Sequence, residues 1–478
     1  MKKVKKFGFV APILIILLLV AITTCFVEGR SGITYLAIGD MLINYIQSYY
    51  YFFDTIIYIF VIGGLYGALN KVPQYKKLVR LVSQKMEGKR RLFVIISTIV
   101  FVLLTAVGGF NLLSLIFIPF VISVIILLGY DKLIALSSTV LATFVGIIGG
   151  VFLNFRDGTN QYASSFTTFD KIAGLNGHFE TIIFRIVLLV ISTLLLVFFI
   201  VRYIRKYDNG EGEGQLSLND VFNVDTKINV DDYKVWPFVL MSCILFIVLV
   251  LGFMPWNDLF GIKCFDDFHT WITGLKIGNY AVFTNLISKN FVAFGRWGDL
   301  GNFMMAVICI FIFLFILKFV SGVKFKELKN GFIYGVKKMI PGVMVLALAF
   351  SVLVAVYNSG FIETVINNFA DSYSDNAFIG AIISIFGTIL NVDLFYVVAG
   401  VFSPLVSSLT DKANLNVYAV LFQSIYGLVQ IFGPTSILLI VSLSYLDVPY
   451  SKWLKYIWRF VLSLFIVIFI ILMIITLI

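Results

Sequence analysis

Two amides and a carboxylate stand inside long apolar stretches of this sequence, where polar side chains are costly. Asn111 lies near the middle of residues 92–130, and Asn391 and Asp393 lie near the middle of residues 376–410. An amide or carboxylate at membrane depth needs partners, and it is a functional-site hypothesis by default. Side-chain and carbonyl oxygens suit Na⁺, and backbone N–H groups at helix N-termini suit anions. These residues therefore predict the binding of a small polar solute and a cation.

Each stretch is followed by an apolar run of helical length that breaks at glycine or proline. The first run breaks at Gly149 and Gly150, and the second breaks at Gly433 and Pro434. In both halves the break follows the amide by about 40 residues. Discontinuous hydrophobic segments at matching places in two halves are the best sequence indication of a secondary transporter's binding site. The expected substrate- and ion-binding residues are Gly108, Gly109, Asn111, Ser114, Gly149, Gly150, Asn154, Asn391, Asp393, Gln423, Gly433, Pro434, Thr435 and Ser436.

Several of these residues also have a structural interpretation that the sequence leaves open. Glycines permit membrane helices to pack closely, and the Ser114 hydroxyl could bond to its own helix. Asp393 could lie at a solvated turn near one surface. Arg185 falls near the outer end of its apolar run, so we expect its side chain to snorkel to the interface.

The composition is that of a membrane protein. Of the 478 residues, 60% are hydrophobic and 13% are charged, about half the charged fraction of a soluble domain. The net charge of +10 comes from basic residues beside hydrophobic spans, where they set topology, so nucleic acid is not expected as a partner. The expected fold is an all-α polytopic membrane protein, with residues 7–27 as an uncleaved first span.

The sequence has little material for catalysis or for a structural metal. Its four cysteines and two histidines have no metal-ligand spacing, so neither a zinc site nor a disulfide framework is predicted. It contains no G-x-S-x-G, Walker A or H-E-x-x-H motif. The chain is therefore not expected to be an enzyme or an ATP-driven pump, and no cofactor is predicted beyond a coupling ion.

The distribution of Lys and Arg predicts the topology. Residues 71–91 hold eight basic residues against one acid, which places this loop and the N-terminus in the cytoplasm and the protein in the cytoplasmic membrane. Residues 92–130 allow either two full helices or a re-entrant hairpin, and Gly109 and Asn111 favour the hairpin. This first hairpin then opens inward and a second one, at 376–410, opens outward, as in two inverted repeats. Trp271 and Trp297 are expected to anchor an external excursion. The expected organisation is scaffold helices at 1–91, a first repeat at 92–206, a linker at 207–234, second-half scaffold helices at 235–338 and a second repeat at 339–478.

Several motifs resemble one family. The segment 432–436 reads FGPTS and is followed at 448–455 by VPYSKWLK, with Gln423 and Gly427 upstream. This pattern resembles the end of the DcuC/YfcC-type anaerobic C4-dicarboxylate carriers, in which a Q…G…ITPTSG run leads to VPYGKWLK. Residues 127–131, which read LLGYD, match that family's LGYD turn.

The resemblance implies a divergent member of the ion transporter superfamily, with two inverted repeats, re-entrant hairpins, broken helices and a dimerising scaffold in a homodimer. It implies elevator-type symport of a C4-dicarboxylate, an amino acid or a related organic anion, coupled to Na⁺ or H⁺, with Na⁺ expected near Asn111 and Asn391. Both hairpin tips are less polar than the family pattern. A transport-inactive homologue that acts as a sensor or partner scaffold is therefore the alternative.

Overall fold

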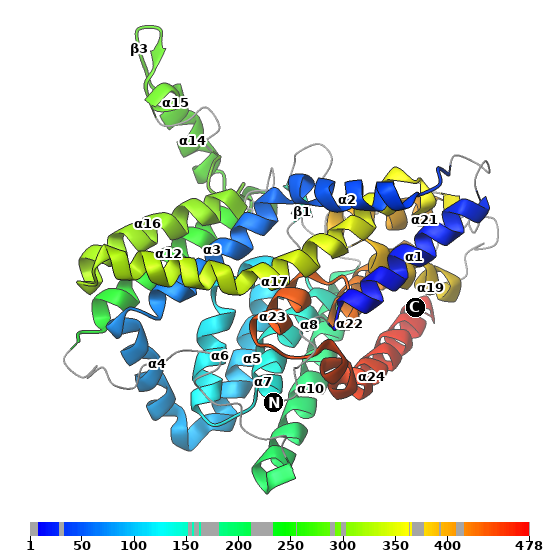
Figure 1. Cartoon of the computed structure of the whole chain (residues 1–478), viewed down its shortest axis with the longest axis horizontal. Helices are drawn as coiled ribbons and strands as arrows, with labels where there is room; N and C mark the ends of the chain where they lie inside the picture. The colour runs from blue at the N-terminus through cyan, green and yellow to red at the C-terminus, as the bar shows by residue number, and fades with distance from the viewer. Residues whose placement is uncertain are drawn as a thin grey trace.

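The structure is a computed structural model that describes residues 8–27, 33–151, 155–156, 162–163, 181–211, 233–254, 256–286, 292–297, 303–362, 364–365, 377–391, 393–407 and 415–477. In these residues the regular structure is helical apart from two antiparallel pairs of two-residue strands. Figure 1 shows the helices crossing at several angles, with the first and second halves of the chain intermixed. Asn154 lies outside the described residues.

The first half begins with four helices and then enters the first interrupted stretch. Short 3₁₀ or π segments (η) interrupt or flank several helices. The elements are α1 (Val10–Val27), α2 (Ile38–Tyr51), α3 (Phe53–Leu69), α4 (Pro73–Met86), η1 (Glu87–Lys89), α5 (Arg90–Ala106), η2 (Leu112–Ile116), α6 (Ile118–Leu127), α7 (Lys132–Leu136), η3 (Ser137–Leu141), α8 (Ala142–Ile148), β1 (Phe155–Arg156), β2 (Tyr162–Ala163), α10 (Ile182–Lys206) and η4 (Tyr207–Glu211).

The second half has a long helix before its interrupted stretch, followed by a broken helix and a terminal span. Its elements are α12 (Trp236–Phe253), α13 (Trp256–Phe260), α14 (Cys264–Gly274), β3 (Lys276–Ile277), β4 (Tyr280–Ala281), α15 (Val282–Leu286), α16 (Phe303–Ser321), α17 (Phe325–Asn358), α19 (Ala377–Leu390), α20 (Leu394–Val397), η5 (Val398–Phe402), α21 (Ser403–Ser407), α22 (Leu415–Phe432), α23 (Ile437–Tyr445) and α24 (Tyr450–Leu477). The expected boundary at 338/339 falls inside the continuous helix α17.

Membrane-spanning helices dominate the described residues. Six spans are long and apolar enough to cross a membrane, or seven if the bent pair α2–α3 forms one more. The apolar windows of α17 and of α22–α23 are 78% and 83% buried, whereas those of α10, α12, α16 and α24 are only 22–33% buried. The first group therefore forms the interior, and the second turns most of its apolar surface outward, as lipid-facing helices do.

A glycine crossing joins the two halves at α3 and α17. A Cβ atom on Gly335 would lie 1.9 Å from the carbonyl oxygen of Gly63, and one on Gly67 would lie 2.2 Å from that of Gly331. Both helices thus carry Gly-x-x-x-Gly, a spacing that lets membrane helices touch through their backbones. Figure 1 shows α3 and α17 lying against each other.

Two further helix pairs cross between the halves. A Cβ atom on Gly427 of α22 would lie 2.8 Å from the backbone nitrogen of Ile148 in α8. The rings of Tyr203 in α10 and Tyr456 in α24 pack edge to face at 4.7 Å between centroids. In these three pairs, the first-half helices come in the order α3, α8, α10, and their second-half partners come in the order α17, α22, α24.

Basic residues from both halves meet at one end of the protein, which we call the basic end. The Arg90 guanidinium lies 5.2 Å from the centre of the Tyr130 ring. Lys132 Nζ donates to the Leu446 carbonyl oxygen at 2.8 Å. The ammonium of Lys338 lies 4.9 Å from the centre of the Tyr445 ring. Loops of both halves therefore share this end.

An arm built from α13, α14, β3, β4 and α15 extends away from the helical body between α12 and α16 (Figure 1). The ring of Trp297 packs on Gly252 at its base, where a Cβ atom would lie 2.1 Å from the indole, and only 3% of Trp297 is exposed. The expectation of an interfacial Trp297 is therefore wrong, because this ring closes the base of the arm. Trp271 is 60% exposed, and its interfacial position stays a prediction.

Candidate functional site

The first interrupted stretch unwinds where the sequence predicts, at residues 107–111, which we call the first tip. Gly109 has a φ of 66°, a conformation that glycine adopts without strain. The Thr105 hydroxyl donates to the Phe110 carbonyl oxygen at 3.2 Å, and the buried Ser114 hydroxyl donates to the Asn111 carbonyl oxygen at 2.6 Å. Ser114 therefore bonds to its own segment, the structural interpretation left open above.

Tyrosines on α3 hold the segment that follows the first tip. The Tyr58 hydroxyl donates to the Leu113 carbonyl oxygen at 3.3 Å, and the Tyr66 hydroxyl donates to the Ile116 carbonyl oxygen. Unsatisfied carbonyls are costly at membrane depth, so the two tyrosines stabilise irregular backbone that would otherwise lack donors.

The first break follows α8 and packs directly on the end of α5. The Val151 N–H donates to the Ala106 carbonyl oxygen at 2.8 Å, and a Cβ atom on Gly150 would lie 3.5 Å from the Cα of Ala106. On its other side, a Cβ atom on Gly149 would lie 2.5 Å from the backbone nitrogen of Leu189 in α10. The first tip and the first break, at residues 149–151, are therefore neighbours.

The second tip, at residues 391–393, separates α19 from α20. Asn391 is 4% exposed, and its Nδ2 donates to the Gly387 carbonyl oxygen at 3.0 Å. Asp393 is half-buried and lies close enough to Tyr426 of α22 for its charge to act on that hydroxyl. The Asn391 amide thus bonds to a carbonyl at the end of its own helix, α19, while the Asp393 carboxylate lies beside α22.

The second break, at residues 433–436, packs on the end of α19 as the first break packs on α5. Helix α22 ends at Phe432, before Gly433 and Pro434, because proline has no N–H to continue the helix. The Thr435 hydroxyl then donates to the Ile389 carbonyl oxygen at 2.7 Å. In each half, the helix that leads into the tip thus meets the break of the same half.

Side chains from distant parts of the chain cap the carbonyl ends at both breaks. Gln423 Nε2 donates to the carbonyl oxygens of Ile147, at 3.0 Å, and of Gly150, so a second-half helix caps the end of α8. At the second break, the Trp453 indole N–H donates to the Ile431 carbonyl oxygen at 2.9 Å, and the Tyr450 hydroxyl donates to the carbonyl oxygen of Phe432. These neutral donors offset the negative ends of both helix dipoles.

Three buried polar atoms near the breaks have no hydrogen-bond partner in the described structure. They are Oε1 of Gln423, the Thr388 hydroxyl and the Ser436 hydroxyl, in residues 1–2% exposed. Because both partners of Gln423 Nε2 are carbonyls, the amide cannot be flipped and Oε1 must point away from them. Ser436 precedes the first turn of α23, whose N–H groups form the positive end of a helix dipole.

The structure groups the predicted residues into two neighbourhoods linked through α22. Along that helix, Gln423 at the first break and Gly433 at the second are separated by about 15 Å at 1.5 Å per residue. Sequence reasoning gave no role to Thr388, Tyr450 or Trp453. Tyr450 and Trp453 fall in the quoted VPYSKW motif, which was the available signal.

The expectation that Arg185 snorkels to the interface is wrong. Its side chain is completely buried in the first turn of α10, and its carbonyl oxygen would lie 2.7 Å from a Cβ atom on Gly149. The residue faces the protein because it shares a helix face with the buried residues Leu188 and Ser192, a periodicity that the sequence displays.

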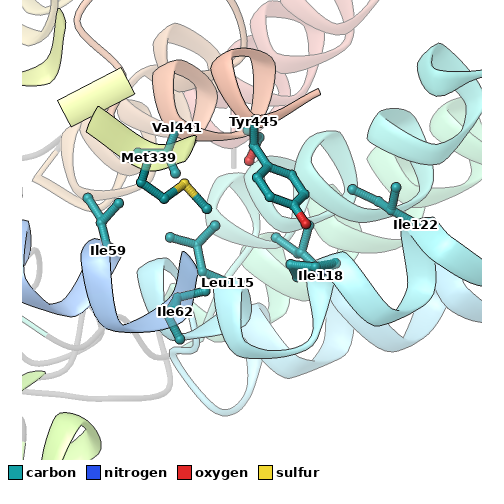
Figure 2. Close-up of a pocket in the computed structure, with 10 residues that line it drawn as sticks. Ile59, Ile62, Leu115, Ile118, Ile122, Met339, Val441 and Tyr445 are labelled. Carbon is teal, nitrogen blue, oxygen red and sulfur yellow. The ribbon is translucent and has the colours of Figure 1, made fainter. Parts of the chain in front are cut away.

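A narrow cavity separates the segment after the first tip from α3, α17 and α23 (Figure 2). Its volume of about 10 Å³ is room for a single water molecule. The lining is almost entirely apolar, so this surface is a packing contact between helices and lies apart from the polar atoms at the breaks. It is formed by Ile59, Ile62, Leu115, Ile118, Pro119, Ile122, Met339, Val441, Ser442 and Tyr445.

The described residues contain no group of three or more His, Cys, Asp or Glu side chains that could hold a metal ion. A Na⁺ site near Asn111 and Asn391 would therefore draw mainly on amide, hydroxyl and backbone oxygens, with Asp393 as the nearby carboxylate.

Comparison with known proteins identifies the family. The model of the family described as "C4-dicarboxylate anaerobic carrier" (DcuC) matches residues 30–477. A protein of Escherichia coli K12 named "Putative basic amino acid antiporter YfcC" is 24% identical over 414 residues, which cover 84% of this chain and 73% of that protein. An uncharacterised protein of Haemophilus influenzae is 20% identical over 436 residues, covering 84% of this chain and 72% of that one.

Among solved structures, that of the Alcanivorax borkumensis YdaH transporter aligns over 97% of both chains, with a TM-score of 0.39 and 10% identity. The family model spans nearly the whole sequence and includes both tips and both breaks. The chain is a multi-pass membrane protein that belongs to the DcuC family of anaerobic C4-dicarboxylate carriers.

Proposed function

We propose that this protein is a secondary active transporter that moves a small organic anion across the cytoplasmic membrane, coupled to Na⁺ or H⁺. One observation carries the proposal. In each half the tip meets its own break, and buried polar atoms there have no partner in the described structure. A buried polar group without a partner costs free energy, so its retention is best explained by a solute that supplies the partner.

The charge pattern of the second break supports an anion. Tyr450 and Trp453 cap the carbonyl end of α22. The N–H end of α23 lies beside the unpartnered Ser436 hydroxyl. A carboxylate suits this place because helix N-termini bind anions through backbone N–H groups and the dipole. A C4-dicarboxylate, an amino acid or a similar carboxylate fits, and the name of the Escherichia coli relative makes amino acids worth testing.

The cross-half pairs α3–α17, α8–α22 and α10–α24 support two inverted repeats that move relative to a dimerising scaffold, as an elevator does. The basic end faces the cytoplasm in this proposal, because Lys and Arg accumulate on that side of membrane proteins. The N-terminus then lies in the cytoplasm too.

Uptake into proteoliposomes tests the proposal. We expect labelled succinate, glutamate or arginine to accumulate under an imposed Na⁺ or pH gradient. Ser436→Ala and Thr388→Val should weaken uptake, because each removes one unpartnered hydroxyl. Ser436 belongs to the second break, and Thr388 precedes Ile389, whose carbonyl bonds to Thr435 of that break. Ser463→Ala is the matched control, since Ser463 is exposed and bonds only within α24.

A folded protein that accumulates none of these solutes under either gradient would contradict transport. It would favour the alternative, a transport-inactive homologue that acts as a sensor or partner scaffold. Accumulation that is equally strong in all three variants would leave transport standing and remove the second break from the site.

A further inference from the structure

A second polar cluster, distant from the tips, surrounds Asp131 at the basic end. Asp131 lies in the turn between α6 and α7 and is 6% exposed. Among the acidic residues whose side chains the structure describes, it is the only buried one. A carboxylate is costly to bury in its charged form, so this position needs an explanation that the solute site does not supply.

Two hydrogen bonds hold the carboxylate. Its Oδ1 accepts from the Ile134 N–H at 2.8 Å, which makes Asp131 the N-cap of α7. Its Oδ2 accepts from the Tyr203 hydroxyl of α10 at 2.8 Å. Both oxygens are therefore already oriented, and one of them bonds to a group that can donate to a carboxylate or accept from a carboxylic acid.

The titratable groups that face Asp131 come from three elements. Lys452 of α24 lies near enough to favour the charged carboxylate. Besides Tyr203, the hydroxyls of Tyr207 in η4 and Tyr456 in α24 lie within reach of its charge. One carboxylate among a lysine and tyrosines lacks the several oxygen ligands that a metal cation needs, whereas it suits a proton.

The cluster also ties the two halves together. Lys132 Nζ donates to the Leu446 carbonyl oxygen in the loop between α23 and α24. The Ser137 hydroxyl donates to the Tyr456 hydroxyl at 2.9 Å. The charge of Asp131 thus acts on residues that hold the first half against the second, so a change in that charge alters this contact.

Burial raises the pKa of Asp131 above its ordinary value, although the Ile134 N–H, the Tyr203 hydroxyl and Lys452 each lower it. A raised pKa in an acid means that the folded protein favours the protonated form. The contribution of Asp131 to stability is therefore greatest at low pH and is lost as the pH rises through the raised pKa.

We propose that Asp131 is the proton-binding site of this carrier, which takes up a proton from water at the basic end and links it to the contact between the two halves. Asp131–COO⁻ and H⁺ give Asp131–COOH, which is neutral beside Lys452. This inference rests on the proposed function where it assigns the coupling ion, but proton binding itself can be measured without transport.

Infrared difference spectra of the full chain in lipid vesicles, recorded as the pH is lowered, test proton binding directly. We expect the native protein to show a carboxyl C=O component that grows at a higher pH than the band of the exposed acids, and we expect this component to be absent from Asp131→Asn, which keeps an N-cap side chain. In Tyr203→Phe the component should appear at higher pH, because a hydrogen bond to the ionised form is removed. Asp208→Asn, a second acid at the basic end paired with Arg90 and Arg91, should leave the component unchanged.

The second experiment measures the uptake of labelled succinate, glutamate and arginine under an imposed pH gradient. A pH gradient should drive uptake in the native protein and lose its effect in Asp131→Asn. If the C=O component that grows at higher pH persists in Asp131→Asn, or if pH-driven uptake persists in that variant, the inference is overturned while transport stands. If the component behaves as expected but no solute moves under any gradient, the proton site stands and the proposed function fails.

Discussion

The Tyr450 hydroxyl supports a precise test of how the second break is stabilised. Tyr450→Phe removes one oxygen atom and leaves the Phe432 carbonyl without its side-chain donor, while Trp453 still caps the Ile431 carbonyl. A buried acceptor left unsatisfied costs about 1–3 kcal/mol, which is roughly a 5–150-fold change in the unfolding equilibrium. Equilibrium unfolding in mixed micelles measures this change.

Tyr50→Phe is the matched control, because Tyr50 is 82% exposed. We expect the control to unfold like the native protein and Tyr450→Phe to unfold earlier. Uncapping the carbonyl end also makes the second break more negative, so anion affinity should fall by about 2–5-fold. Identical unfolding of the two variants would refute the reasoning that Tyr450 satisfies a buried carbonyl.

Three further perturbations test other parts of the account. Gly335→Ala should destabilise the fold by about 1–3 kcal/mol in the same unfolding assay, because the new methyl group meets the Gly63 carbonyl. The control, Gly39→Ala, should not destabilise the fold, because no atom lies within 4 Å of the new methyl group. Identical unfolding curves for the two variants would contradict the glycine crossing. Trp271→Phe should reduce the quenching of tryptophan fluorescence by brominated lipids, since Trp271 is exposed, and unchanged quenching would place the arm away from the bilayer. Asp208→Asn should cost about 1–3 kcal/mol in the same unfolding assay, because the carboxylate is only 10% exposed and pairs with both Arg90 and Arg91. A loss below about 0.5 kcal/mol would show that these pairs contribute no more than exposed pairs do.

The sequence predicts the helical membrane class and the places where helices are interrupted. The apolar runs and their Gly, Pro and Asn interruptions are local features, and helices α5, α8, α19 and α22 end next to the predicted residues. These interruptions can be predicted because non-helical backbone inside a membrane is rare, and the Gly, Pro and Asn residues that permit it stand out in a long apolar segment.

Contacts between distant segments could not be predicted in the same way. The capping of Phe432 by Tyr450, and of Ile147 by Gln423, joins elements whose local patterns say nothing about each other. The position of Arg185 near the end of its apolar run suggests an interfacial side chain, whereas the helix face that it shares with Leu188 and Ser192 correctly indicates burial. The metal, coupling-ion and dimer predictions stay predictions, as do the roles of the individual site residues.

Thiol labelling at the second break tests the central claim most directly, namely that the solute occupies the breaks. Ser436→Cys, in a chain whose four native cysteines are replaced by serine, would be reacted with a maleimide in proteoliposomes, with Ser463→Cys as the control. We predict that the transported solute slows the labelling of Ser436→Cys and leaves that of Ser463→Cys unchanged. Equal labelling rates at position 436 with and without saturating solute, in a protein that still transports it, would contradict the account.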